Sequence, residues 1–137
     1  SDGGYRVTGR TSTGVLDDTD VLLIKKNANG DEEWTQTFGG NYYDQGWSID
    51  QTRDNGYIIT GYTEPLGNER QNVWLIKVDE YGDEEWNRTF GDSNSADYGY
   101  WVEQTDDDGY IIVGRKHIIG EYTYVYLIKT DSEGNVE

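Results

Sequence analysis

The chain has 137 residues, with 27 acidic and 11 basic side chains and a formal net charge of −16. This charge disfavours nucleic acid, whose phosphates need a basic surface, and it disfavours docking on anionic lipid. The absence of cysteine excludes disulfides and thiolate metal sites, and no apolar run is long enough for a membrane helix. Abundant glycine, tyrosine and tryptophan with short apolar runs are typical of strands and turns.

Three copies of one repeat follow one another along the chain. A marker segment of eight residues begins at Asp2 (DGGYRVTG), Asp54 (DNGYIITG) and Asp107 (DDGYIIVG). A second segment of 20 residues starts at Val21 and returns at Val73 with 12 positions identical, and a shorter third copy starts at Val125. A repeat of about fifty residues indicates an architecture built from stacked, similar units.

The three units are not equally complete. A segment that reads GWSIDQT from Gly46 has a counterpart that reads GYWVEQT from Gly99, but no copy of it precedes Asp2. We therefore expect three strands, then four, then three followed by a short stub. The predicted units are a partial unit over residues 1–40, a complete unit over 41–92 and a partial unit over 93–137, which together make one segment of a larger fold.

Four strands are predicted for the complete unit, over residues 47–52, 56–63, 73–78 and 84–90. Short turns join the third strand to the fourth in each copy, at Asn29-Gly30, Tyr81-Gly82 and Glu133-Gly134. Glycine there supplies the positive φ that a tight hairpin requires. Similar turns at Asn55-Gly56 and Asp108-Gly109 join the first strand to the second. These glycines are interpreted as structural.

The third strand of each unit is apolar on both faces, over residues 21–24, 73–78 and 125–128. A strand that is apolar on both faces has a layer packed on each side. The sheets of a β-propeller have this property, because each blade lies between two neighbours. The predicted fold is therefore all-β: a β-propeller fragment of about three four-stranded antiparallel blades, of which the first and last are incomplete. A tandem β-sandwich is the alternative.

The repeat resembles the SBBP-type β-propeller repeats of bacteria and archaea. The segment FGGNYYDQGWSIDQTRDNGYIITGYT, followed by VWLIKVDEYGDEEWNRTFGD, has the glycine-rich loop and the successive strands of that family. The resemblance implies a part of a large secreted or cell-surface protein, often joined to adhesion modules, and it supplies no catalytic residues. This chain departs from a closed propeller in having too few blades and in lacking a first inner strand and a last outer strand.

No constellation of residues typical of catalysis is found. His117 is the only histidine and is predicted to be a solvated loop residue. Nucleophile-elbow, phosphate-loop and dinucleotide motifs do not occur. The pairs Glu32-Glu33 and Glu84-Glu85 resemble glycosidase carboxylates, but neighbouring residues of a strand face opposite ways and cannot flank one bond. The chain is therefore predicted to be neither an enzyme nor a cofactor carrier.

Calcium is the one metal that the acidic runs suit. The first run contains Asp17, Asp18 and Asp20, and the second spans residues 106–108. Calcium requires six to eight oxygen ligands that converge on one point, and neither run has the spacing of an EF-hand. Solvated turns are the favoured interpretation of both runs.

The loops between units contain the residues most suited to binding a ligand. Aromatic faces combined with polar groups recognise sugars and peptides. The candidate rim residues are Tyr42, Tyr43, Asp44, Asp97 and Tyr98. The favoured alternative is that Trp47 and Tyr100 pack between blades while the other residues only decorate the rim. Asn87-Arg88-Thr89 also matches the acceptor sequence for N-glycosylation.

Three functions remain open at this point. The first is a structural or interaction module of an extracellular or cell-surface protein, which contacts protein partners or associates with itself through exposed sheet edges. The second is a carbohydrate-binding propeller that recognises a glycan through the tyrosine-rich rim. The third is the scaffold of a larger extracellular enzyme whose catalytic residues lie elsewhere, because a fold alone does not define a function.

Overall fold

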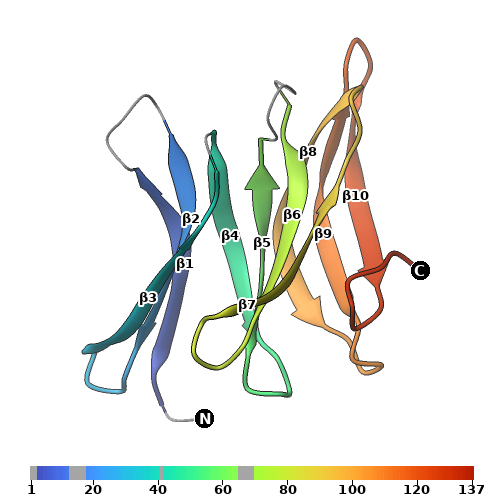
Figure 1. Cartoon of the computed structure of the whole chain (residues 1–137). Helices are drawn as coiled ribbons and strands as arrows, with labels where there is room; N and C mark the ends of the chain where they lie inside the picture. The colour runs from blue at the N-terminus through green and yellow to red at the C-terminus, as the bar shows by residue number, and fades with distance from the viewer. Residues whose placement is uncertain (1–2, 13–17, 41, 65–69) are drawn as a thin grey trace.

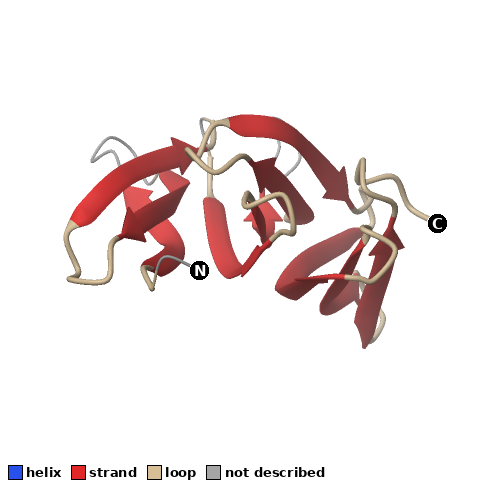
Figure 2. Cartoon of the chain, turned by 90° about the horizontal axis from the view of Figure 1, so that it is seen from below, coloured by secondary structure: helices blue, strands red, loops and turns tan. Residues whose placement is uncertain are grey.

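The computed structural model describes residues 3–12, 18–40, 42–64 and 70–137, and it places ten strands in three antiparallel sheets (Figure 1). The N-terminal sheet contains β1 (Tyr5–Ser12), β2 (Thr19–Lys26) and β3 (Glu32–Phe38) in that order. The middle sheet contains β4 (Asp44–Gln51), β5 (Tyr57–Thr63), β6 (Asn72–Val78) and β7 (Glu84–Phe90) in that order. The C-terminal sheet contains β8 (Ser95–Gln104), β9 (Tyr110–Ile118) and β10 (Thr123–Thr130), with β9 in the centre. Figure 2 shows the three sheets side by side, with the middle sheet between the other two.

The all-β prediction is confirmed, and the three sheets contain the three, four and three strands that the repeats predicted. In the parts of the chain that the structure describes, no element is a helix that could span a membrane. The predicted boundaries hold within a residue except in β4, which begins at Asp44 rather than Trp47. A β-bulge at Trp47 shifts the pairing with β5 between Gly46 and Ser48. A bulge interrupts the alternation of side chains between the two faces of a strand, so the sequence pattern did not predict that this strand begins so early.

Two apolar cores join the sheets, one on each face of the middle sheet. The first core contains Val21, Leu23, Tyr57, Ile59, Trp74, Ile76 and Val78, which come from the N-terminal and middle sheets. The second contains Ile58, Val73, Leu75, Val102, Tyr110, Ile112 and Ile128, which come from the middle and C-terminal sheets. Strand β6 contributes to both cores and is buried from Val73 to Val78. The prediction that this strand is covered on both faces is confirmed.

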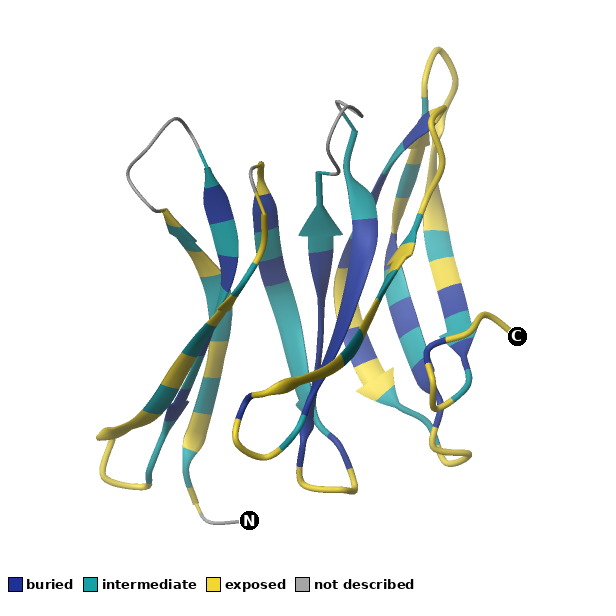
Figure 3. Cartoon of the chain, viewed as in Figure 1, coloured by how far each residue is buried: buried dark blue, intermediate teal, exposed yellow. Residues whose placement is uncertain are grey.

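The same prediction is wrong for the copies of this strand in the two end sheets. In β10, Val125 is 83% exposed and Leu127 is 63% exposed. In β2, one face is buried, whereas Leu22 and Ile24 on the other face are only half-buried. Figure 3 shows buried and half-buried positions alternating along β2, whereas most of the first half of β10 is exposed. The local sequence is similar in all three copies, but of the three described sheets only the middle one has a neighbour on each side.

The tight turns follow the predicted glycine pattern with one correction. In the turns between the third and fourth strands, φ is 87° at Gly30, 86° at Gly82 and 78° at Gly134. In the other turns, the positive φ belongs to Asn55 (69°) and Asp108 (65°) instead of the following glycine. Gly56 is required for a different reason, since a Cβ there would overlap the main-chain carbonyl oxygen of Val78.

The predicted stub follows β10 and turns back along its edge. Val136 forms an isolated antiparallel bridge with Thr130. The amide of Glu137 donates a hydrogen bond to the carbonyl oxygen of Lys129 at 3.1 Å. These contacts correspond to the beginning of a fourth strand, because Glu137 occupies the repeat position of Glu85 in β7.

Candidate functional site

A buried lysine clamps three parts of the middle sheet together. The Lys77 ammonium lies 2.8 Å from Asp54 Oδ2 and 2.5 Å from Glu85 Oε2, and the residue is only 3% exposed. The repeat produces the same clamp in the C-terminal sheet, where Lys129 lies 2.9 Å from Asp107 and 2.8 Å from Glu137. In both clamps, carboxylates balance the lysine charge, so we interpret these ion pairs as structural contacts.

Replacing Lys77 with methionine is expected to lower the free energy of unfolding by about 1.5 kcal/mol, because charge-assisted hydrogen bonds are lost at a buried position. The equivalent Lys129→Met variant is expected to lose less stability, since Lys129 is more exposed and solvent screens its ion pairs. Urea denaturation of both variants measures the difference. An equal or larger loss in Lys129→Met would contradict the prediction.

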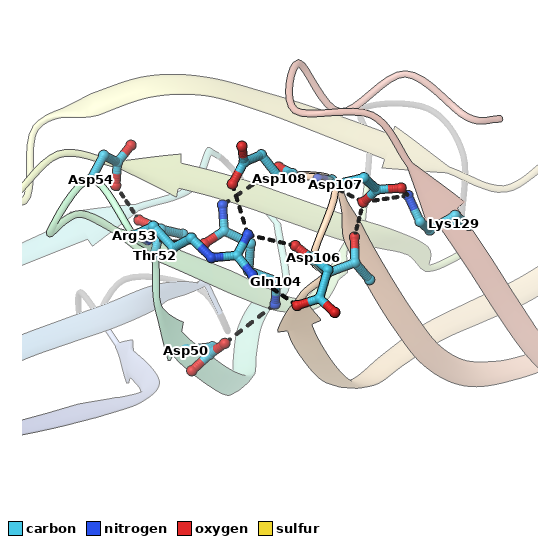
Figure 4. A network of polar contacts seen from close by, with 11 residues as sticks. Asp50, Thr52, Arg53, Asp54, Gln104, Asp106, Asp107, Asp108 and Lys129 are labelled. Atoms are coloured by element: carbon cyan, nitrogen blue, oxygen red, sulfur yellow. Dashed lines mark hydrogen bonds and ion pairs between the residues drawn. The ribbon is translucent and has the colours of Figure 1, made fainter.

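A polar cleft of about 500 Å³ opens between the middle and C-terminal sheets, beside the clamps. Arg53 is one of the residues that line this cleft, and Figure 4 shows its guanidinium among the carboxylates of the second acidic run. The Arg53 guanidinium donates hydrogen bonds to Asp108 Oδ1 and to the carbonyl oxygen of Thr105, each at 2.7 Å, and to Asp106 Oδ1 at 3.2 Å. Its main-chain amide donates to Gln104 Oε1 at 2.9 Å. The cleft is therefore a polar joint between two sheets, whose charges are largely paired.

The second acidic run does not converge on a metal. Asp106 and Asp108 accept hydrogen bonds from Arg53, whereas Asp107 pairs with Lys129. Hydrogen bonds from Thr105 and Lys129 hold the pKa of Asp107 well below its usual range. Among the residues that the structure describes, no group of three or more acidic, histidine or cysteine side chains is placed to hold a metal ion. The three carboxylates are instead divided between two cations of the chain itself.

Tyr110 lines the cleft beneath the ion network. Burial raises the pKa of its phenol to about 12, and the nearby carboxylates of Asp54, Glu85 and Asp108 add to the effect. The ring of Trp86 packs edge-on against it, with 5.7 Å between the ring centroids. The phenol therefore stays protonated at neutral pH and acts as a packing residue of the joint.

At the opposite end of the sheets, two carboxylates face each other across the first junction, which we define as the contact between the N-terminal and middle sheets. Asp44 is 3% exposed; its Oδ2 accepts a hydrogen bond from the Gly40 amide at 3.0 Å, and its Oδ1 has no hydrogen-bond partner. The Oδ1 atom of Asp20 is also buried without a hydrogen bond. A Cβ at Gly39 would overlap Asp20 Oδ1 and lie 2.9 Å from Asp44 Oδ2, so the two side chains meet at this glycine. We call Asp20 and Asp44 the acidic pair.

The second junction, between the middle and C-terminal sheets, has the same geometry with different charges. Asp97 is fully buried, and a Cβ at Gly91 would overlap Asn72 Oδ1 and lie 2.8 Å from Asp97 Oδ2. Here the Lys116 ammonium lies 3.5 Å from Asp97 Oδ2 and 2.9 Å from Asp92 Oδ2. As at the first junction, Asp97 Oδ1 has no hydrogen bond. The buried charge of Asp97 is nevertheless balanced by a lysine.

Replacing Asp44 with asparagine is expected to stabilise the protein at pH 7 in metal-free buffer. Burial raises the pKa of Asp44 above its ordinary 3.8 and outweighs the hydrogen bonds from Thr63, Gly40 and Glu64, and the nearby charge of Asp20 adds to the rise. A raised pKa means that ionising this carboxyl group costs more free energy in the folded state than in the unfolded state. The folded protein therefore loses stability as the pH rises through the pKa that the group has in the folded state. The gain in Asp44→Asn is therefore present at neutral pH and disappears below about pH 4.

Urea denaturation at pH 7 and at low pH measures this gain, and Asp92→Asn is the control of opposite sign. The hydrogen bond from Lys116 lowers the pKa of Asp92, so its carboxylate stabilises the fold above the unfolded pKa. Asp92→Asn is therefore expected to lose stability at pH 7 and to match the wild type once the pH falls through the folded pKa. If both variants changed stability in the same direction, the explanation from pKa would be wrong.

The structure separates the predicted rim residues. Tyr42 and Tyr43 are each 38% exposed, whereas Asp44 and Asp97 are buried. Tyr98 is half-buried and donates its hydroxyl hydrogen bond to Gln71 at 2.8 Å. The two aspartates are therefore closed off from a ligand at the surface, and a role in binding stays a prediction for the exposed tyrosines.

An aromatic cluster joins the middle and C-terminal sheets along their first strands. Trp47 stacks on Tyr100 with ring centroids 5.0 Å apart and on Tyr98 at 5.7 Å, and Tyr62 completes the cluster. The Arg115 guanidinium lies 4.6 Å from the centre of the Tyr98 ring. The sequence predicted the packing of Trp47 and Tyr100 between sheets, but it placed Tyr98 on the rim. β4 has a bulge at Trp47 and β8 has one at Tyr100, and both rings lie at the contact between the middle and C-terminal sheets.

Two further predicted features lie on exposed strands. Asn87 is exposed on β7, where its Oδ1 accepts a hydrogen bond from Trp74 Nε1 at 3.2 Å and its amide group donates to Glu84. Glycosylation at Asn87 stays a prediction. His117 lies on β9 and not in a loop, because β9 extends to Ile118. Its Nδ1 lies 3.0 Å from Thr123 Oγ1 across the hairpin.

The remaining predicted candidates are the first acidic run and the glutamate pairs. Asp17 of the first acidic run lies outside the described residues, whereas Asp18 lies just before β2. One member of each glutamate pair contacts a lysine of the neighbouring strand: Glu33 contacts Lys25, and Glu85 contacts Lys77.

Comparison with known proteins adds no family assignment. No protein-family model matches the chain, and no curated protein sequence matches it. The resemblance of the repeat to the SBBP family therefore stays a prediction.

Proposed function

We propose that this chain is a non-catalytic assembly module of an extracellular or cell-surface protein, with the sheets arranged as blades of a β-propeller. Its two end sheets pack against sheets of the same repeat in a second copy of the chain. The observation that carries this proposal is that both end faces expose apolar residues whose repeat counterparts are buried between sheets.

The end face of the C-terminal sheet has the composition of a sheet-to-sheet contact. Val125 and Leu127 are 83% and 63% exposed, whereas their counterparts Val73 and Leu75 are fully buried. In the N-terminal sheet, Leu23 at the same position is also fully buried. In each internal case, the residues are covered by the next sheet along the chain. A sheet of the same repeat therefore fits against the exposed end face of the C-terminal sheet.

The end face of the N-terminal sheet presents the complementary half of that contact. Tyr5 and Val7 are 57% and 49% exposed, whereas their counterparts Tyr57 and Ile59 are buried. At each internal junction, a tryptophan of the preceding sheet packs on this tyrosine. The ring centroids are 6.0 Å apart for Trp34 and Tyr57 and 5.7 Å apart for Trp86 and Tyr110.

The two end faces differ, so the contact is head to tail. A heterologous contact of this kind forms a closed ring when the rotation between units closes, and closure is how a propeller removes its exposed faces. The internal junctions supply the template, because the same repeat positions meet in each of them. Exposed apolar patches of this type are typical of protein contacts.

Sedimentation velocity over a range of protein concentrations tests the assembly. The wild type is expected to associate, and Leu127→Glu and Val7→Glu are each expected to remain monomeric, because every contact needs one face of each kind. A mixture of the two variants is expected to form a dimer, since one supplies an intact N-terminal face and the other an intact C-terminal face. An interface between identical faces would not give this complementation.

Tyr81→Glu is the matched control, because Tyr81 is 65% exposed in a hairpin turn away from both end faces. It is expected to associate as the wild type does. A wild-type chain that stays monomeric at every concentration would overturn the proposed assembly, and so would association that both face variants leave unchanged.

Carbohydrate binding is a second candidate, favoured by two exposed aromatic residues on β8. Tyr100 and Trp101 are 44% and 47% exposed, next to the aromatic cluster. Aromatic faces with adjacent polar groups stack on sugar rings. A glycan array tests this candidate: binding that is lost in Trp101→Ala supports it, and the absence of binding above background removes it.

A further inference from the structure

The acidic pair points to a site for a hard divalent cation at the first junction. We infer that one such cation, with calcium as the probe, binds between Asp20 of the N-terminal sheet and Asp44 of the middle sheet. This site is independent of the end faces, and it would join two sheets through one ion.

The buried carboxylate of Asp44 is the observation that indicates a ligand. The residue is 3% exposed, yet one of its oxygens has no hydrogen-bond partner. Asp20 Oδ1, which is also buried without a partner, approaches Gly39 from the other sheet, beside Asp44 Oδ2. Buried carboxylates without partners are costly unless a cation or hydrogen bonds compensate them.

The repeat provides an internal comparison that identifies the missing charge as positive. At the second junction, Asp97 takes the place of Asp44, and the Lys116 ammonium lies 3.5 Å from it. The position of Lys116 is occupied by Thr63 at the first junction. Asn72 takes the place of Asp20, and Asp92, which pairs with Lys116, takes the place of Gly40. Each junction thus has two carboxylates, and the first lacks the lysine that the second has.

The ligand set favours a calcium-like ion of moderate affinity. Carboxylate oxygens are the preferred ligands of hard cations, and calcium tolerates an irregular shell completed by main-chain oxygens and water. Only two carboxylates meet at Gly39, and no third acidic, histidine or cysteine side chain of the described residues joins them in a metal group. Affinity in the range of extracellular calcium modules, with Kd of about 10⁻⁴–10⁻³ M, is therefore expected.

Thermal unfolding and calorimetric titration of the intact chain test the site. Calcium at about one hundred times Kd is expected to raise the Tm of the wild type by about 10 °C, relative to a chelator at matched ionic strength. Titration is expected to give about one calcium ion per chain. Asp44→Asn and Asp20→Asn are expected to lose both the heat of binding and the shift in Tm.

Thr63→Lys is the decisive variant, because it copies the lysine of the second junction into the first. It is expected to raise Tm in the chelator and to abolish the response to calcium. Asp83→Asn, which removes an exposed charge in a hairpin turn, is the control and is expected to keep the full response. The site would be overturned by no binding up to about 10 mM calcium, well above the expected Kd. A response that persists in Asp44→Asn or in Thr63→Lys would also overturn it, because calcium would then act through the general charge of −16.

Discussion

Replacing Leu75 with alanine is expected to lower the free energy of unfolding by about 3 kcal/mol. Leu75 is fully buried in β6 and packs in the core between the middle and C-terminal sheets. Truncating a buried leucine removes its transfer free energy and leaves a cavity that the neighbouring sheets fill only in part. Urea denaturation monitored by tryptophan fluorescence measures the change.

Leu127→Ala is the matched control, because Leu127 occupies the same repeat position in β10 and is 63% exposed. At a protein concentration at which the chain is monomeric, its expected loss is within about 0.5 kcal/mol. Similar losses in the two variants would mean that the end face of the C-terminal sheet is covered within a single chain. The comparison therefore also tests whether that face is available to a second copy.

Replacing Gly61 with alanine is expected to cost about 3 kcal/mol, at the upper end of the range for overpacking. A Cβ at Gly61 would overlap the carbonyl oxygen of Gln45 on the neighbouring strand β4. A main-chain atom in a sheet cannot move aside as the end of a flexible side chain can. Gly114 repeats this environment, because a Cβ there would overlap the carbonyl oxygen of Tyr98.

Gly9→Ala is the corresponding control. Gly9 has the same position in the repeat, but a Cβ there would meet nothing within 4 Å. Alanine in a strand loses less conformational entropy on folding than glycine, so this variant is expected to be neutral or to gain up to about 1 kcal/mol. Urea denaturation of both variants measures the change in the free energy of unfolding. A large loss in Gly9→Ala would show that another strand lies beside β1.

These comparisons share one physical basis. The repeat places the same residue in three environments, and the number of neighbouring strands or sheets decides its energetic role. Leu75 and Leu127 differ by a covering sheet, whereas Gly61 and Gly9 differ by an adjacent strand. The proposed assembly and the proposed cation site follow the same reasoning. The end faces lack the covering sheet that their internal counterparts have, and the first junction lacks the lysine that the second junction has.

Most of the local structure could be predicted from the sequence. The repeat spacing located the strands, and the glycine turns located the hairpins, because alternation and turn chemistry are properties of a few neighbouring residues. The prediction failed at β4, where a bulge at Trp47 interrupts the alternation. It also failed to bury Asp44 and Asp97, since both had been assigned to exposed loops.

The amino-acid pattern alone was enough to predict an all-β chain with three repeats, and to predict the three, four and three strands that the described residues form. Which copies of the repeat are covered, and which charges meet, depends on how the sheets pack. This packing buries Leu75 and exposes Leu127, and it places Lys116 beside Asp97 while leaving Asp44 beside Asp20. The reason is that strand formation depends on neighbours in sequence, whereas burial and charge pairing depend on residues about fifty positions away.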